Sequence, residues 1–207
     1  MDNFQIPISE NGTTTLATAG KYCDRNIDVI VNVESTEALP NGYLKVDPTW
    51  TSFYMLCNGR PSLAANLKYS DTANGTNFSS MFQSCLVKVI PSLDFRKGTN
   101  FSGIFNYSYT IEEIGTMDIS SATNVLNMFN GCTGLKRITF APYCINLSIS
   151  FANCGLLDDA SVQSIVDGLA DLTGQTAQKL TFHATVGANM TQAQKDAVSA
   201  KNWTLVY

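Results

Sequence analysis

The sequence predicts an α/β solenoid, in which parallel strands and short helices alternate along the chain and stack. The first observation behind this prediction is a nine-residue motif: Asn, an apolar residue, two variable residues, Met or Ile, Phe, two variable residues and Cys. Its four copies are 77–85, 100–108, 124–132 and 146–154, and a degenerate copy covers 53–57. The copies end 23, 24 and 22 residues apart (85 to 108, 108 to 132, 132 to 154). Self-similarity at a fixed period of about 20 to 50 residues is typical of stacked repeat architectures.

The second observation is a short apolar pattern that follows the motif. After Cys132 it runs Leu135-Lys-Arg-Ile138-Thr-Phe140, and related segments lie at 87–92 and 111–116. The pattern L-x-x-L-x-L is the strand of a leucine-rich repeat, with its apolar residues pointing inward. The sequence therefore predicts a leucine-rich-repeat solenoid. Each unit would carry the motif on a short helix or helical turn, followed by a strand that stacks in parallel on its neighbours.

These residues also resemble a known family. The segment from Met128 to Ile138 is similar to the A-F-x-x-C-x-x-L-x-x-I unit of BspA-type leucine-rich repeat proteins, and closer to their variant with Asn-x-x-x-Met-Phe-x-x-Cys. The resemblance covers roughly residues 53–155; Ile104, Ser108 and Ser150 depart from it. It implies a protein of a bacterial surface or of a phage or prophage tail that mediates adhesion.

Residues 1–45 differ from the repeats and are predicted to form a small β cap or an attachment module. The segment 6–16 begins like a strand and contains the turn signal Asn11-Gly12, and 27–33 alternates apolar and polar residues. This part resembles segments common in phage tail and bacterial surface proteins. Shielding the first repeat and attaching the chain to a longer fibre or to sister chains remain equal alternatives.

Repeats are predicted for 46–155, and 156–207 is predicted to hold larger helix–strand units that close the solenoid. Apolar residues at helical spacing indicate a helix over 159–172, with Gly174 as its stop. A strand is expected at 178–183. Thr191 and Gln194 match a capping box that opens a helix to about Lys201, and a final strand is expected at 203–207.

Composition excludes several functions. Among 207 residues 14% are charged, the net charge is −4 and there is no basic cluster, so nucleic-acid binding is not expected. No apolar run reaches the roughly 18 residues of a membrane span, so no membrane insertion is expected. The N-terminus lacks the features of a signal peptide. The polar, weakly charged composition is typical of extracellular or virion proteins, which is the expected location.

Because the copies should stack, residues at equivalent positions should form columns of side chains, and three such columns are predicted. Cys57, Cys85, Cys132 and Cys154, with Ser108 completing the set, should form a buried column of reduced thiols. The motif asparagines should point inward and bind the backbone of the turns. The third column is Asp71, Asp94 and Asp118, each six residues before a motif Asn. It is interpreted either as a calcium site or as three Asx turns. Asx turns are preferred, and no metal site is predicted.

No catalytic constellation is predicted, so the chain is not expected to be an enzyme or to need a cofactor. The single histidine, His183, is expected to be a satisfied or exposed residue at a strand end. Glu112 and Glu113 are adjacent, so on a strand they point to opposite faces and make a poor pair for glycosidase chemistry.

The predicted ligand-binding residues lie on the outward face of the strands: Glu113, Arg137, Thr139, Lys179 and Thr181. Glu113 and Arg137 should be cross-strand neighbours, for which a surface ion pair is the simplest interpretation. Tyr107, Tyr109 and Tyr143 either stack on sugars or cover the rim of the core.

The leading functional hypothesis is a non-enzymatic adhesion or receptor-recognition module whose partner is a host cell-surface glycan or protein. One alternative is a structural spacer of a virion or cell surface, in which the repeats form a homo-oligomer interface. A weaker alternative is a carbohydrate-active enzyme.

Overall fold

The computed structural model describes residues 49–59, 64, 67 and 71–207, together with the backbone of 5–10 and 13–18. In the N-terminal part, β1 (Gln5–Glu10) and β2 (Thr13–Thr18) pair as an antiparallel hairpin, so β structure is confirmed there. The alternating segment 27–33 and Cys23 lie outside the described residues.

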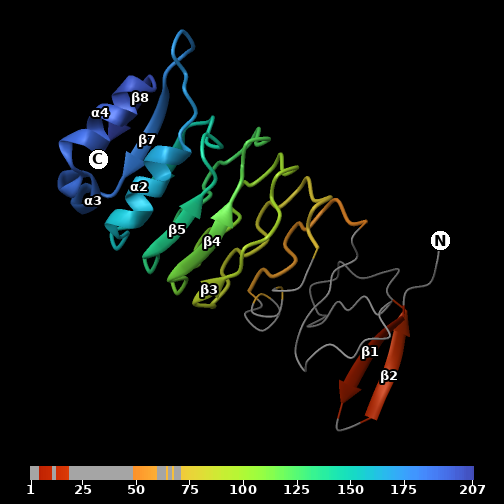
Figure 1. Cartoon of the computed structure of the whole chain (residues 1–207). Coiled ribbons are helices and arrows are strands. Elements are labelled where there is room, and N and C mark those ends of the chain that lie inside the picture. The colour runs from red at the N-terminus through yellow and green to blue at the C-terminus, as the bar shows by residue number, and fades with distance from the viewer. Residues whose placement is uncertain (1–4, 11–12, 19–48, 60–63, 65–66, 68–70) are drawn as a thin grey trace.

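The described chain is an α/β domain with two separate three-stranded parallel sheets and three short helices (Figure 1). The first sheet contains, in this order, β3 (Val89–Ile90), β4 (Glu113–Met117) and β5 (Arg137–Phe140). The second contains β6 (Ile149–Phe151), β7 (Gln178–Phe182) and β8 (Trp203–Val206). The helices are α2 (Asp159–Gly168), α3 (Ala184–Asn189) and α4 (Gln192–Ala200). The predicted leucine-rich-repeat solenoid is therefore wrong.

One reason is that the motif segments form turns rather than helices. Alternate N–H groups, those of residues 78, 80, 82 and 84, donate to the carbonyls of residues 100, 102, 104 and 106 in the next copy. In every copy except the last, two positions have left-handed backbone: Met55 and Gly59, Ser80 and Ser84, Gly103 and Tyr107, Asn127 and Gly131. A right-handed helix cannot contain such residues at regular intervals. The segments therefore satisfy their backbone groups between copies.

The last copy changes conformation for a reason visible in its sequence. Its fourth residue is Ile149, where the earlier copies have the left-handed Met55, Ser80, Gly103 and Asn127. A β-branched residue is strongly disfavoured in the left-handed region. The copy becomes strand β6 instead, and Ile149 pairs with Leu180 of β7.

The first sheet ends at β5 because α2 occupies the place of a fourth strand (Figure 1). The backbone N–H of Ile138 donates to Oγ of Ser161 at 3.0 Å, and that of Phe140 donates to Oγ of Ser164 at 2.9 Å. Asp158 caps the helix by accepting from the N–H of Ser161. Two serine side chains of the helix thus accept the hydrogen bonds of the N–H groups at the edge of β5.

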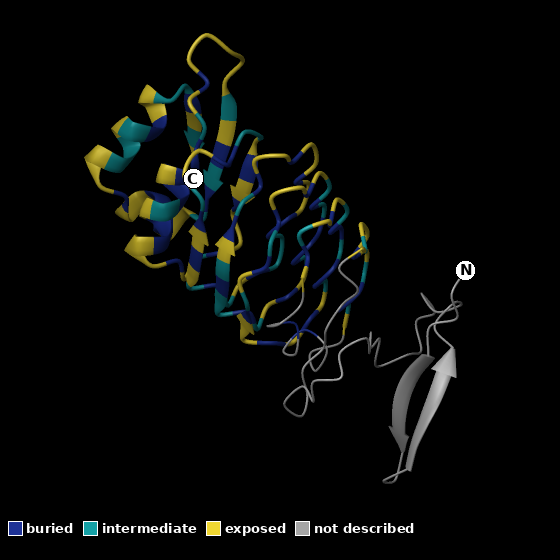
Figure 2. Cartoon of the chain, turned by 45° about the vertical axis from the view of Figure 1, so that its right-hand side comes forward, coloured by how far each residue is buried: buried dark blue, intermediate teal, exposed yellow. Residues whose placement is uncertain are grey.

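The core lies between the motif turns and the strands, and it is built around stacked phenylalanines. Neighbouring rings of Phe82, Phe105, Phe129, Phe151 and Phe182 have centroids 4.6–5.7 Å apart. The inward residues predicted for β5, Leu135, Ile138 and Phe140, are buried. Figure 2 shows the exposed residues on the loops and on the outward sides of the helices. The apolar pattern of the strands was therefore interpreted correctly.

The asparagine column binds the turns but does not point inward. Oδ1 of Asn77, Asn100 and Asn124 accepts the N–H two residues further on at 3.1 Å in each case. Asn77 and Asn100 are only partly buried, and Asn124 is exposed. At these three positions the predicted hydrogen bond is confirmed and the predicted burial is wrong. Asn146 differs: its Nδ2 donates to the carbonyl of Ser120 at 3.1 Å, and its Oδ1 is buried without a hydrogen-bond partner.

The aspartate column consists of Asx turns. Asp71, Asp94 and Asp118 accept the N–H of Ala73, Arg96 and Ser120 at 2.9, 3.1 and 3.0 Å. Among the residues that the structure describes, no three His, Cys, Asp or Glu side chains are grouped so that they could hold a metal ion. The calcium interpretation has no support in this geometry.

The C-terminal elements follow the sequence closely. The strand at 178–183, the capping box of Thr191 and Gln194, the helix behind it and the last strand are confirmed. Helix α2 ends at Gly168, before the predicted 172, and Gly174 lies in the following loop. The short helix α3 was not predicted.

Candidate functional site

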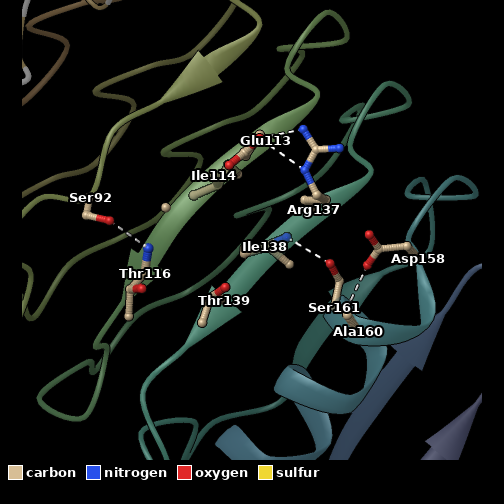
Figure 3. Close-up of a pocket in the computed structure, with 11 residues that line it drawn as sticks. Ser92, Glu113, Ile114, Thr116, Arg137, Ile138, Thr139, Asp158, Ala160 and Ser161 are labelled. Atoms are coloured by element: carbon tan, nitrogen blue, oxygen red, sulfur yellow. Dashed lines mark hydrogen bonds and ion pairs between the residues drawn. The ribbon is translucent and has the colours of Figure 1, made fainter.

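A groove of about 320 Å³ lies on the outer face of the first sheet, between the end of β3 and the start of α2 (Figure 3). The polar residues that line it come from four segments: Ser92, Glu113, Thr116, Arg137, Thr139, Asp158 and Ser161. Three of the five residues predicted to bind a ligand, Glu113, Arg137 and Thr139, lie here together. Ile114 and Ile138 belong to its floor.

The ion pair of Glu113 and Arg137 forms one wall of the groove. The two residues are register partners on β4 and β5. Nε and Nη2 of Arg137 donate to the same oxygen, Oε2 of Glu113, at 3.0 and 2.5 Å. These bonds raise the pKa of Arg137 above its usual value. Within residues 71–207 Oε1 of Glu113 and Nη1 of Arg137 make no further hydrogen bond, so both can face a ligand.

The opposite end of the groove depends on a bulge in β4. The pairing shifts between Ile114 and Thr116, so Thr116 rather than Gly115 lies across from Thr139. Oγ of Ser92 accepts the N–H of Thr116 at 3.1 Å. A Cβ on Gly115 would lie 2.4 Å from Oγ of Ser92, so only glycine allows this approach. Unbroken alternation along the strand would put Gly115 on the outward face two residues after Glu113, and the bulge puts Thr116 there instead.

The third side of the groove is the first turn of α2, which sequence reasoning did not connect with the sheet. Asp158 accepts from the N–H of Ser161 at 2.8 Å. Ser161 is buried and also donates to the carbonyl of Lys136 at 3.3 Å. The repeat period could have indicated this contact. Ile138 lies 24 residues after Ile114, and Ser161 lies 23 residues after Ile138, so Ser161 falls within one residue of the next equivalent position.

Lys179 and Thr181 are not part of this groove. Both lie on β7 in the second sheet, where Lys179 pairs with Thr204 of β8 and Thr181 with Ser150 of β6. The prediction placed all five residues on one continuous sheet face. The structure divides that face because α2 follows β5.

A second charged row lies beside the groove. Glu112 pairs with Lys88 at 3.0 Å and with Lys136 at 2.8 Å, while its neighbour Glu113 pairs with Arg137. Hydrogen bonds from the two lysines, Lys136 first, lower the pKa of Glu112 to about 2. The two glutamates thus have different partners, as the alternation of a strand requires.

The buried thiols and the histidine have structural surroundings. Burial raises the pKa of Cys132 to about 12 and that of Cys144 to about 11, so neither thiol ionises near neutral pH. Sγ of Cys132 donates to the carbonyl of Phe105. Nδ1 of His183 accepts the N–H of Thr185 and caps α3. The role predicted for His183, a satisfied residue at a strand end, is confirmed.

No protein-family model, no curated protein and no solved structure matches the chain. In the described part of the chain no helix is long and apolar enough to span a membrane. The geometry of the groove therefore supplies the functional argument.

Proposed function

We propose that this chain is a non-enzymatic recognition module that binds a surface ligand through the groove on its first sheet. The observation that carries the proposal is the open set of polar groups around the ion pair of Glu113 and Arg137. Ser92, Thr116 and Thr139 line the same groove at the end opposite this pair (Figure 3). Such an arrangement offers donors and acceptors in fixed places, which orient a bound ligand.

The carboxylates near the groove favour binding over catalysis. Glu113 is held by Arg137, Glu112 by two lysines, and Asp158 by the first turn of α2. General acid–base chemistry on a glycosidic bond needs two carboxylates that face one bond. The two carboxylates that line the groove, Glu113 and Asp158, are each already bound, by Arg137 and by the N–H of Ser161, which supports a module without enzymatic activity.

The setting that we propose is the surface of a bacterial cell or the tail of a phage. The likeness of the Asn-x-x-x-Met-Phe-x-x-Cys unit to BspA-type surface proteins supports this setting, as does the low content of charged residues, 14%. The partner would then be a glycan or protein on a host cell. If no such partner exists, the remaining alternative is a structural spacer of a virion or cell surface.

The test is binding of the labelled protein to a panel of bacterial strains, with a variant that keeps the ion pair and reverses its direction. The double substitution Glu113→Arg with Arg137→Glu should preserve the fold, because both side chains are about half exposed and the pair remains. It should weaken saturable cell binding roughly tenfold, since it exchanges the donor and acceptor sides of the groove. Lys179→Glu on the second sheet is the matched control and should bind normally.

Two results would contradict the proposal. Unchanged cell binding by the double variant would exclude the groove as the site. Absence of binding to every strain, even by an artificially trimerised protein, would exclude recognition and leave the structural spacer. Removal of surface glycans from strains that bind separates glycan partners from protein partners.

A further inference from the structure

Exposed apolar side chains lie on and directly after the motif turns, and none of them lines the groove. Three of them are Leu86, Tyr107 and Tyr109, which we call the tyrosine ridge. The exposed fractions of these residues are 49%, 58% and 56%. Leu86 and Tyr109 each follow a column residue, Cys85 or Ser108, in neighbouring copies, so they occupy equivalent places. Tyr107 and Tyr109 flank the buried Ser108.

Tyr107 is held in an unfavourable backbone conformation. Its φ is +57°, in the left-handed region that large side chains rarely adopt. The equivalent left-handed residues in the other copies are small: Gly59, Ser84 and Gly131. A large aromatic residue at this place costs stability, and strain of this kind is concentrated at functional sites.

The neighbouring copy accommodates the ring of Tyr107. A Cβ on Gly131 would lie 3.0 Å from Cδ1 and 3.1 Å from Cα of Tyr107, so the glycine leaves room for the tyrosine. The N–H of Tyr107 donates to the carbonyl of Asn130 at 2.8 Å. The ring is therefore seated on one side and open to solvent elsewhere.

Side-chain amides surround this seat. Nδ2 of Asn130 donates to Oδ1 of Asn106 at 2.9 Å, and the N–H of Gly131 donates to Oδ1 of Asn153 at 3.0 Å. Within residues 71–207 the Nδ2 groups of Asn106 and Asn153 make no hydrogen bond. Two amide donors with their positions fixed through their own oxygens thus remain available next to the ridge.

The motif turns that carry the ridge contain no charged residue, and the charged row of Lys88, Glu112 and Lys136 begins just beyond them. The stretches 77–87, 100–111, 124–135 and 146–157 contain no Asp, Glu, Lys or Arg. Apolar ring faces beside fixed amide groups suit a ligand that presents C–H faces and hydroxyls together, as a neutral sugar ring does. Recognition of an anionic polymer would require cations, which these stretches lack.

We propose that the tyrosine ridge is a binding site for a neutral oligosaccharide, with a sugar ring on Tyr107 and its hydroxyls on the amides of Asn106 and Asn153. This inference rests on the proposed recognition function and names a ligand class. It adds a site separate from the groove at Glu113 and Arg137.

The test is titration of the full chain with maltohexaose, cellohexaose, chitohexaose and xylohexaose, with an anionic hexagalacturonate for comparison. Tyr107→Gly is the decisive variant, because glycine occupies the equivalent place at Gly59 and Gly131 and relieves the strain. It should keep or raise the thermal midpoint while binding of the neutral hexamer weakens roughly tenfold. Tyr143→Gly is the matched control: Tyr143 is also exposed, with φ +58°, but lies beside Lys201. It should bind normally.

The outcomes separate this inference from the function on which it rests. Binding of a neutral hexamer that Tyr107→Gly leaves unchanged overturns the site, and failure of all four neutral hexamers overturns the ligand class. If cells are still bound in that second case, recognition stands and the groove is its site. If cells are not bound either, the proposed function fails as well.

Discussion

Ser108 replaces cysteine in the buried column and connects two copies of the motif. Its Oγ accepts the N–H of Cys85 at 3.0 Å and donates to the carbonyl of Phe82. Ser108→Ala should lower the free energy of unfolding by about 1–3 kcal/mol. The buried N–H of Cys85 loses the shorter of its two hydrogen bonds and keeps only the one to the carbonyl of Phe82 at 3.2 Å, and that carbonyl loses the bond from the hydroxyl. Ser108→Cys should lose less, since the thiol of Cys132 makes a similar bond to Phe105. Urea unfolding measures both, and an alanine variant as stable as the parent would contradict the argument.

Glu112 should make stability depend on acid pH. Its pKa in the folded protein is about 2, against a usual value of 4.5, because of Lys136 and Lys88. A lowered folded pKa contributes stability above the unfolded pKa, and this contribution disappears as the pH falls from about 4.5 through about 2. The difference in thermal midpoint between the parent and Glu112→Gln should be constant above pH 5 and vanish near pH 2. A difference that does not change with pH would show that the lysine pairs do not stabilise the fold.

Helix α2 acts at the scale of elements, because it ends the first sheet through two serine side chains. Ser161→Ala should cost about 1–3 kcal/mol, since it leaves the buried N–H of Ile138 without its acceptor. Ser164 is only partly buried, so Ser164→Ala should cost less. Hydrogen exchange at Ile138 and Phe140 in each variant tests which edge contact is lost. If Ser161→Ala left the exchange at Ile138 unchanged, α2 would not be what protects the edge of β5.

The whole described domain is joined by the stacked phenylalanines, and its two tryptophans lie near opposite ends of the described sequence. Trp50 lies beside Phe53, with ring centroids 6.2 Å apart, and Trp203 is buried in β8. Phe129, between Phe105 and Phe151, lies in the middle of the ring stack. Phe129→Leu should lower the free energy of unfolding by about 1–3 kcal/mol.

Both tryptophans should report the same loss if the domain unfolds as one unit. Trp50→Phe and Trp203→Phe backgrounds separate the two signals. A shift of only one tryptophan's transition would show that the two sheets unfold separately.

The sequence alone predicted the features that depend on residues close together in the chain. The capping box of Thr191, the strand at 178–183 and the inward residues Ile138 and Phe140 depend on near neighbours in the chain. The ion pair of Glu113 and Arg137 also followed, because the repeat fixes which residues lie across from each other.

The tertiary structure determined the features that depend on hydrogen-bond partners in other parts of the chain. The motif segments form turns instead of helices because their N–H groups donate to carbonyls in the next copy. The sequence of a single copy does not show these partners. The separation of Lys179 and Thr181 from the groove depends on α2, whose serines take the hydrogen bonds of a fourth strand. The bulge at Gly115 depends on the approach of Ser92 from another unit. Spacing along the chain determines which residues are equivalent, whereas partners distant in the chain determine how their backbone groups are satisfied.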